Sequence, residues 1–457
     1  MKKNEVNMLS GSIVKGLLAV TIPIMVMNVL LSLFNIIDMT MLGQFVDDNA
    51  VGAVGASGTL ISLVTGLLIG IAAGANVIVA KYIGKGDEES VQRAVGTSIL
   101  FSIVGGLFLT VVGISFAEIF LTWMNCPKSL FADAVLYFKL YFAGVPLLLL
   151  YNFIAAILRS MGDSKRPMYF LTFGGIVKVA LNALFIIVFD MDVVGVALST
   201  IISWAVSAIL CFWALLKNKG IVQFKKKHFR FYKKELGEIL FIGVPAGMQS
   251  ALYSLANVII SATVNGFGEA ATKGISIANQ FDGVLYQISV APSLAVMSFV
   301  SQNISAGNIR RVKQTAVKAT FLAIAFGATF GALSAIFSGT LSSFMSSDPI
   351  VIEYSRQKMV LISSTYFICG INEIMCASLR GIGKPIIPTI STLIFMCGIR
   401  FIWVYLIFPL YKNLTFLYLI WPIGWVLSIV LLTSVFIPYI KKLNKTQIEN
   451  KPTEKIG

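Results

Sequence analysis

The chain has 457 residues, of which 57% are hydrophobic and 12% are charged. Its mean hydropathy is +0.85, whereas in a soluble domain about a quarter of the residues are charged. This composition excludes an ordinary soluble domain and predicts an integral membrane protein.

About 20 apolar residues cross the hydrocarbon of a bilayer as a helix. The chain contains about twelve such stretches with short polar joints, so we expect an all-α membrane protein with twelve transmembrane helices. The first stretch follows Lys2 and Lys3 but is too long for a signal peptide, and no small-residue cleavage site precedes the next stretch. We expect spans at residues 16–42, 51–80, 94–120, 134–158, 168–189, 193–216, 237–265, 272–300, 314–340, 356–379, 386–408 and 415–439.

The net charge of +15 is distributed unevenly between the predicted joints. With a cytoplasmic N-terminus, the inner segments hold 28 lysines and arginines and the outer segments hold six. The positive-inside rule therefore places both termini in the cytoplasm of a bacterial-type plasma membrane. The basic stretch "KNKGIVQFKKKHFRFYKKELGE" reads as a solvated linker beside lipid, so we expect no nucleic-acid partner.

The two halves of the chain match when one is shifted onto the other by about 221 or 222 residues. Pro23 then meets Pro245, and "LRSMGDSKRP" (158–167) lies over "LRGIGKPIIP" (379–388). Each half has six predicted helices, so both insert with the same orientation, related by an axis along the membrane normal. We expect an N-lobe at 1–216, a cytoplasmic basic linker at 217–236, a C-lobe at 237–440 and a basic tail at 441–457.

Several catalytic and energy-coupling motifs are missing from the sequence. There is no GxxxxGK[ST] phosphate loop and no G-x-S-x-G or H-E-x-x-H motif, and the only histidine, His228, lies in the linker. The five cysteines are an odd number and four lie within predicted helices, so no disulfide framework or metal site is indicated. We expect a transporter driven by an ion gradient or by the gradient of its own substrate, without enzymatic activity or cofactor.

The first predicted helix, with "LFNIIDMTMLGQF", contains an acid. A charge at this depth costs about 2.5–3.5 kcal/mol on insertion scales, and such residues usually face a bundle interior and mark an ion or substrate path. Asn35 lies one turn before Asp38 on the same helical face, and Pro23 removes a backbone hydrogen bond and permits a hinge. Asp38 is therefore the leading candidate for coupling, and a structural carboxylate is the alternative.

The fifth predicted helix carries Lys178 and Asn182 on one face. A buried lysine needs a partner, and Asp38 is the obvious one in the same lobe. The predicted span ends offset the two by roughly 12 Å, so snorkelling of Lys178 towards a water-filled cleft stays open.

The C-lobe contains three further buried charges. We expect Glu373 and Arg400 to form a structural ion pair. Asp282 either binds a cationic substrate or lies at the rim.

Taken together, these segments resemble the multidrug and toxic compound extrusion (MATE) family of cation-coupled efflux transporters. The resemblance covers roughly residues 15–440 and rests on "NIIDMTMLGQF", on "AKYIGKGDEESVQRAV" with "SQNISAGNIRRVKQTAV", and on the two LRxxG motifs. It implies two six-helix lobes that export amphipathic, often cationic compounds in exchange for protons or sodium. It also implies a coupling-ion site around Asp38 with Lys178 and Asn182, and with Thr200 as the hydroxyl of helix six.

The sequence departs from the family pattern in helix five. Many relatives resemble an Asn-x-x-x-Asp/Asn arrangement, whereas this chain reads Lys178-x-x-x-Asn182. An ammonium group there would repel Na⁺, so we expect proton coupling, with sodium as the alternative. A major facilitator and a lipid-linked saccharide flippase are the competing transporter classes. We expect a monomer in membrane lipid, with small amphipathic molecules as its partners.

Overall fold

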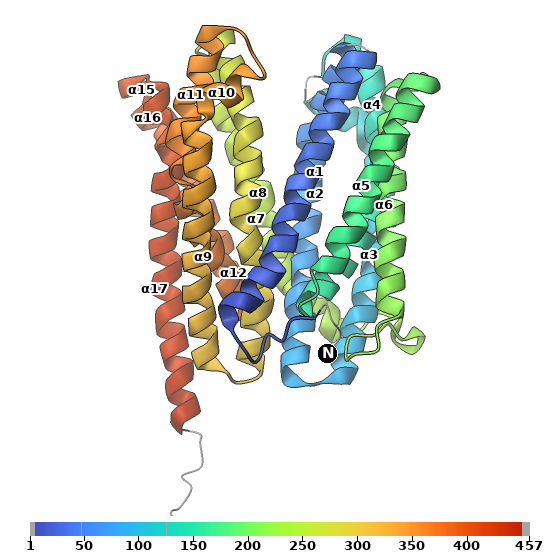
Figure 1. Ribbon diagram of the computed structural model, residues 1–457, viewed down its shortest axis with the longest axis vertical. Coiled ribbons are helices and arrows are strands. Elements are labelled where there is room, and N and C mark those ends of the chain that lie inside the picture. Colours follow the sequence, from blue (N-terminus) through green and yellow to red (C-terminus); the bar gives the residue numbers. More distant parts are fainter. Residues whose placement is uncertain (1–4, 47, 125, 450–457) are drawn as a thin grey trace, which may run out of the picture. The chain divides into compact units, whose positions relative to one another are not determined.

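The computed structural model describes residues 5–46, 48–124 and 126–449, and the ordered elements in these ranges are all helical (Figure 1). A chain in lipid must satisfy its backbone hydrogen bonds internally, and a long apolar stretch does so as a helix. The first six long helices are α1 (Ile13–Phe45), α2 (Asp48–Lys85), α3 (Glu88–Trp123), α4 (Lys128–Ser160), α5 (Lys165–Ala183), which continues as the π-helix η1 (Leu184–Val188), and α6 (Asp192–Leu216).

The linker contains the short 3-10 helix η2 (Lys226–His228), and the second half follows it. Its elements are α7 (Lys233–Asn265), α8 (Glu269–Ser305), α9 (Ile309–Ile336), α10 (Ser338–Ser343), α11 (Pro349–Ser363), α12 (Tyr366–Gly381), α13 (Ile386–Ser391), η3 (Thr392–Gly398), α14 (Ile399–Ile402), η4 (Trp403–Ile407), α15 (Phe408–Tyr411), α16 (Leu414–Tyr418) and α17 (Ile420–Glu449).

The number of membrane spans agrees with the sequence. Within the described ranges, eleven helices are long and apolar enough to cross a membrane, and α11 with α12 forms a twelfth span when the pair is counted as one. The all-α fold with twelve spans is therefore confirmed. The predicted span 356–379 is, however, bent by 47° between α11 and α12, and the predicted span 386–408 contains the π-helical turns of η3 and η4.

The chain forms two compact units. Unit 1 contains residues 1–6 and 22–254, and unit 2 contains residues 7–21 and 255–457. Two helices are shared, because α1 passes from unit 2 to unit 1 after Thr21 and α7 passes from unit 1 to unit 2 after Ser254. The N-lobe at 1–216 and the C-lobe at 237–440 stay a prediction of which parts of the chain move as rigid bodies during transport.

Both halves use the same turn after the LRxxG motif. Gly162 follows α4 with φ +86° and Gly383 follows α12 with φ +81°. These are left-handed backbone conformations that a side chain disfavours, which explains why the glycine is kept in both copies of the motif.

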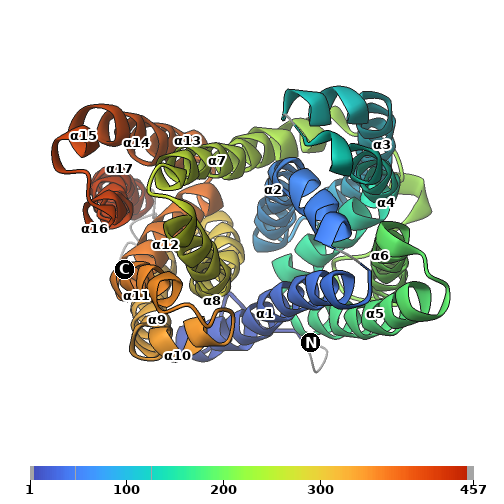
Figure 2. The ribbon, with the colours of Figure 1, turned by 90° about the horizontal axis from the view of Figure 1, so that it is seen from above.

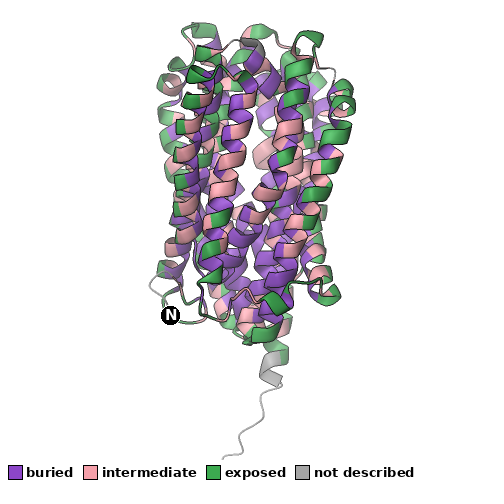
Figure 3. Ribbon diagram, turned by 90° about the vertical axis from the view of Figure 1, so that its right-hand side faces the viewer, coloured by how far each residue is buried: buried purple, intermediate pink, exposed green. Residues whose placement is uncertain are grey.

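Within unit 1, helices that carry the candidate site lie next to one another. Figure 2 shows α1 beside α5 and α5 beside α6, and α6 also packs on α4. Exposed residues run along the lengths of the helices as well as at their ends (Figure 3). Many of them are large and apolar, such as Phe108 and Val111 on α3, as expected for helix faces in contact with lipid.

Candidate ion-coupling site

The candidate site forms where side chains of α1 and α5 meet within unit 1. Asp38 on α1 is only 7% exposed. One turn before it, Phe34 lies against Gly175, where an added Cβ would be 1.8 Å from the Phe34 ring. The glycine therefore leaves room for the Phe34 ring against α5, one turn before the acid.

The Asp38 carboxylate is bound on both oxygens by α5. Lys178 Nζ lies 2.5 Å from Oδ2, and Asn182 Nδ2 donates to Oδ1 over 2.7 Å. The three side chains are buried. Ser199 of α6 donates to the Asn182 carbonyl oxygen and so fixes the amide with its NH₂ group towards the acid. The arrangement satisfies a buried carboxylate with one ammonium and one amide, which is the compensation that a charge in hydrocarbon needs.

The offset between Asp38 and Lys178 along the helices, as predicted from the span ends, is larger than the helix ends of the structure give. The sequence boundaries place the acid about four residues from its helix end, but α1 continues to Phe45. The α5 span continues through η1 to Val188. The remaining difference of three residues corresponds to roughly 4.5 Å, which the lysine stem covers. Lys178 pairs directly with Asp38 instead of snorkelling.

Two residues assigned to the site lie outside its hydrogen-bond network. Asn35 is exposed, and its side chain makes no hydrogen bond with any described residue. Thr200 is buried, but Ser199 supplies the helix-six hydroxyl. Adjacent residues on a helix point about 100° apart, so a shift of one position moves the hydroxyl out of the site. The "LSTIIS" stretch indicates a hydroxyl at this place but not which one.

The predicted hinge residue Pro23 lies inside α1, which continues through it as one helix. The division between the compact units falls between Thr21 and Ile22, next to this proline. Pro23 thus lies where the helix changes from one unit to the other.

Unit 2 contains a second buried ion pair. Lys358 Nζ on α11 lies 2.8 Å from Asp282 Oδ2 on α8 and also donates to Asn279. From the sequence, Lys358 counts among the six outer cations because it lies at the very start of the predicted span 356–379, but only 3% of it is exposed. The predicted role of Asp282 as a receptor for a cationic substrate is therefore disfavoured, because its charge is already compensated.

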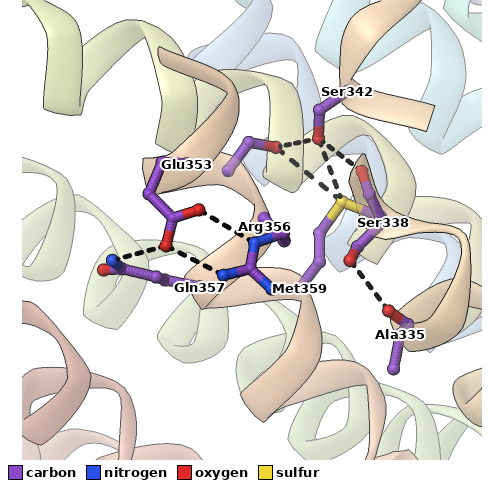
Figure 4. Close-up of polar contacts among 8 residues, drawn as sticks. Ala335, Ser338, Ser342, Glu353, Arg356, Gln357 and Met359 are labelled. Carbon is purple, nitrogen blue, oxygen red and sulfur yellow. Dashed lines mark hydrogen bonds and ion pairs between the residues drawn. The ribbon is translucent and has the colours of Figure 1, made fainter. Parts of the chain in front are cut away.

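The first turns of α11 are held by a hydrogen-bond network shown in Figure 4. Ser342 of α10 donates to the Ser338 carbonyl over 2.8 Å and reaches the Met359 sulfur at 3.8 Å. Within α11, Arg356 pairs with Glu353 at 2.9 Å. These contacts fix the segment from which Lys358 enters the core of unit 2.

Arg400 does not form the predicted pair with Glu373. Both residues are buried, but no ion pair joins them in the described part of the chain. Arg400 donates to the Asn257 carbonyl oxygen over 2.7 Å and lies 5.1 Å from the centre of the Trp421 ring. The guanidinium therefore faces α7 and α17 instead of α12.

The two halves share a feature that sequence reasoning missed. A shift of 222 residues brings Asn35 onto Asn257 and Lys178 onto Arg400, whereas the shift of 221 residues that aligns the two LRxxG motifs brings Lys178 onto Ile399, the residue before Arg400. In each half, a cation from the fifth long span binds a polar side chain of the first: Asp38 in unit 1 and Asn257 in unit 2. The spacing of the repeat was the signal that could have paired Arg400 with Asn257.

A duplicated set of long apolar helices with buried ion pairs defines a multi-pass membrane transporter. The MatE family model matches residues 23–184 and again residues 245–406. The chain belongs to the MatE family. The two matches have the same length and are related by the shift that brings Pro23 onto Pro245, which confirms the internal duplication. The membership excludes a major facilitator.

Similar proteins extend over most of the chain. "Probable multidrug resistance protein YoeA" of Bacillus subtilis is 27% identical over 386 residues, 83% of each chain. A protein named "FAD transporter" from Shewanella oneidensis is 23% identical over 84% of this chain and 85% of its own. A solved structure of a MOP superfamily transporter from Pyrococcus furiosus is 19% identical, has a TM-score of 0.89 and covers 97% of this chain and 99% of its own, which supports the fold.

Proposed function

We propose that this protein is a secondary active antiporter that exports amphipathic, cationic organic compounds in exchange for protons. The support for export is its family and the name of the Bacillus relative. The observation that carries the coupling is the buried contact of Asp38 with Lys178 and Asn182. We also propose that the protein lies in a bacterial plasma membrane with both termini in the cytoplasm, as its distribution of Lys and Arg indicates.

The mechanism starts from the charge state of the Asp38 carboxylate. When it is ionised, it attracts the Lys178 ammonium and holds α1 against α5. Protonation removes that attraction and leaves a neutral acid that accepts fewer hydrogen bonds from α5. The contact between the helices then weakens, and α1 can move about Pro23 while the lobes alternate between the two sides of the membrane.

Lys178 is the reason for favouring protons over sodium. A bound alkali cation needs several oxygen ligands, and the Asp38 carboxylate is the charged one in this network. Its Oδ2 oxygen is occupied by the ammonium, which also repels a second cation at short distance. A proton requires only one carboxylate oxygen and no coordination shell.

The test is dye transport by purified protein in vesicles under an imposed proton or sodium gradient. Wild type should drive uptake of a fluorescent cationic dye with a proton gradient and not with a sodium gradient. Asp38→Asn should reduce proton-driven uptake at least roughly tenfold, a barrier change of about 1.4 kcal/mol, whereas Asp133→Asn, at an exposed acid of the same unit, should leave it unchanged.

Two outcomes would overturn the coupling assignment. One is uptake that follows sodium and ignores the proton gradient. The other is a Lys178→Asn variant with unaltered ion dependence. FAD should be included as an anionic competitor, because one relative carries that name; strong competition would overturn the assignment of a cationic substrate.

A further inference from the structure

A cavity of about 320 Å³ lies in unit 2 between the first turns of α9 and the last turns of α17. Its apolar floor includes Ile309, Phe436 and Ile440, which are all less than a tenth exposed. Three cations surround this floor: Arg310 and Lys313 from α9, and Lys441 from α17.

These cations lack partners in the described part of the chain. All three are exposed, and no ion pair or hydrogen bond joins Arg310, Lys313 or Lys441 to a described residue. The neighbouring Arg311 differs, since its guanidinium donates to the carbonyl oxygens of Met8, Ser10 and Gly11. The charge of Arg311 thus serves the fold, whereas the charges around the cavity are available to a ligand.

The first turn of α9 has the opposite charge from its counterpart in the other half. In α3, Glu88 and Glu89 lie in the first turn, where the helix dipole favours acids. The first turn of α9 contains no acid, and Arg310 takes the place of Glu89 under the shift that aligns the two LRxxG motifs. Cations at this end of a helix are unfavourable unless an anion accompanies them.

The helix faces below the cations are apolar and exposed. On α9, Val317 and Phe321 continue the row of Arg310 and Lys313 at spacings of three and four residues, which lie on one side of a helix. They are 47% and 69% exposed. On α17, Ile437 and Val430 continue the row of Lys441 at spacings of four and seven and are 47% and 61% exposed.

We propose that this cavity binds the headgroup of an anionic phospholipid, with an acyl chain along the apolar rows of α9 and α17. The expected spans begin at residue 314 and end at residue 439, so the cations lie at the level where hydrocarbon gives way to headgroups. Basic hollows between helices at the cytoplasmic interface suit anionic headgroups. A soluble anion would gain nothing from the exposed apolar rows.

The experiment compares lipid retention by native mass spectrometry. Protein is reconstituted in phosphatidylcholine vesicles containing a minor fraction of phosphatidylglycerol and is then extracted. The test variant combines Arg310→Gln, Lys313→Gln and Lys441→Gln. The control removes three exposed linker charges through Lys219→Gln, Lys226→Gln and Lys227→Gln.

Wild type and the linker control should retain phosphatidylglycerol in preference to phosphatidylcholine. Each cation near the surface contributes about fivefold in affinity, so the triple change should reduce this preference roughly a hundredfold. Phosphatidylglycerol should also raise the unfolding temperature of wild type and not of the test variant. Unfolding in pure phosphatidylcholine serves to verify that the test variant is folded.

Three results would overturn the proposal. The test variant could retain phosphatidylglycerol as wild type does, or the linker control could lose it equally, which would indicate a general charge effect. Inorganic phosphate could also stabilise the protein as much as phosphatidylglycerol does, which would indicate a site for a soluble anion.

Discussion

Replacing Lys178 by Met tests how strongly the buried ion pair binds α1 to α5. The change leaves the Asp38 carboxylate, 7% exposed, with the Asn182 amide as its remaining donor in the network. Removing one partner of a buried pair costs about 3–5 kcal/mol. Since the Asn182 amide still stabilises the acid, we expect the loss of unfolding free energy to be at the low end of this range, about 3 kcal/mol.

The double variant Asp38→Leu/Lys178→Met separates the pair from its surroundings. It leaves no uncompensated charge, so it should be destabilised by at most about 1 kcal/mol. The resulting coupling energy of several kcal/mol is measured as a double-mutant cycle, with reversible unfolding in mixed detergent micelles followed by circular dichroism.

The exposed pair of Lys139 with Glu118 is the matched control. It lies in the same unit at 2.8 Å, with side chains that are 36% and 64% exposed. Such pairs contribute about 0–1 kcal/mol. If the cycle at Asp38 and Lys178 gives a coupling energy no larger than this control, the ion pair does not hold the two helices together.

Three further predictions concern other parts of the fold. Burial, followed by the nearby Lys227, lowers the pKa of His228 from 6.5. The backbone of His228 in η2 packs against Gly96 of α3, so the stability of this contact is present above pH 6.5 and is lost as the pH falls below it. His228→Gln should abolish the acid-induced rise in linker amide exchange, corrected for intrinsic rates. Gly175→Ala should destabilise the protein by about 1–3 kcal/mol through overpacking, unlike Gly55→Ala, where an added Cβ meets no atom within 4 Å; equal stability of the two variants would refute the close approach. Lys358→Met should cost about 3 kcal/mol, whereas loss of the exposed Lys412 should leave the unfolding midpoint unchanged, and an equal shift in both would contradict the buried pair.

Most of the fold could be predicted because a bilayer imposes length and apolarity on each span. The break between α11 and α12 falls at Ser364 and Thr365, where no proline or glycine marks it. The π-helical turns of η3 and η4 were also missed, since hydropathy depends on composition and not on the register of backbone hydrogen bonds.

The site could be predicted in part, because burying a charge is costly enough to imply a partner. That argument named Asp38 as the partner of Lys178 but left snorkelling open as the alternative. The family resemblance pointed to Thr200 as the helix-six hydroxyl, whereas the rotation of α6 brings Ser199 to Asn182, although both hydroxyls are buried. Lys358 was missed because it lies at the start of the predicted span 356–379 and was therefore counted with the cations of the outer segments.

The contact of Arg400 with Asn257 has a consequence for the stoichiometry of transport. A guanidinium keeps its proton in proteins, and an amide has no acidic proton to exchange, so this connection persists at any physiological pH. Its counterpart in unit 1 contains a carboxylate and, under the proposed proton coupling, would be released by one proton. We therefore expect one of the two duplicated contacts, Arg400 with Asn257, to persist throughout the cycle. The other, Lys178 with Asp38, would be broken by a single proton, so this pair of contacts would couple at most one proton to each transport cycle.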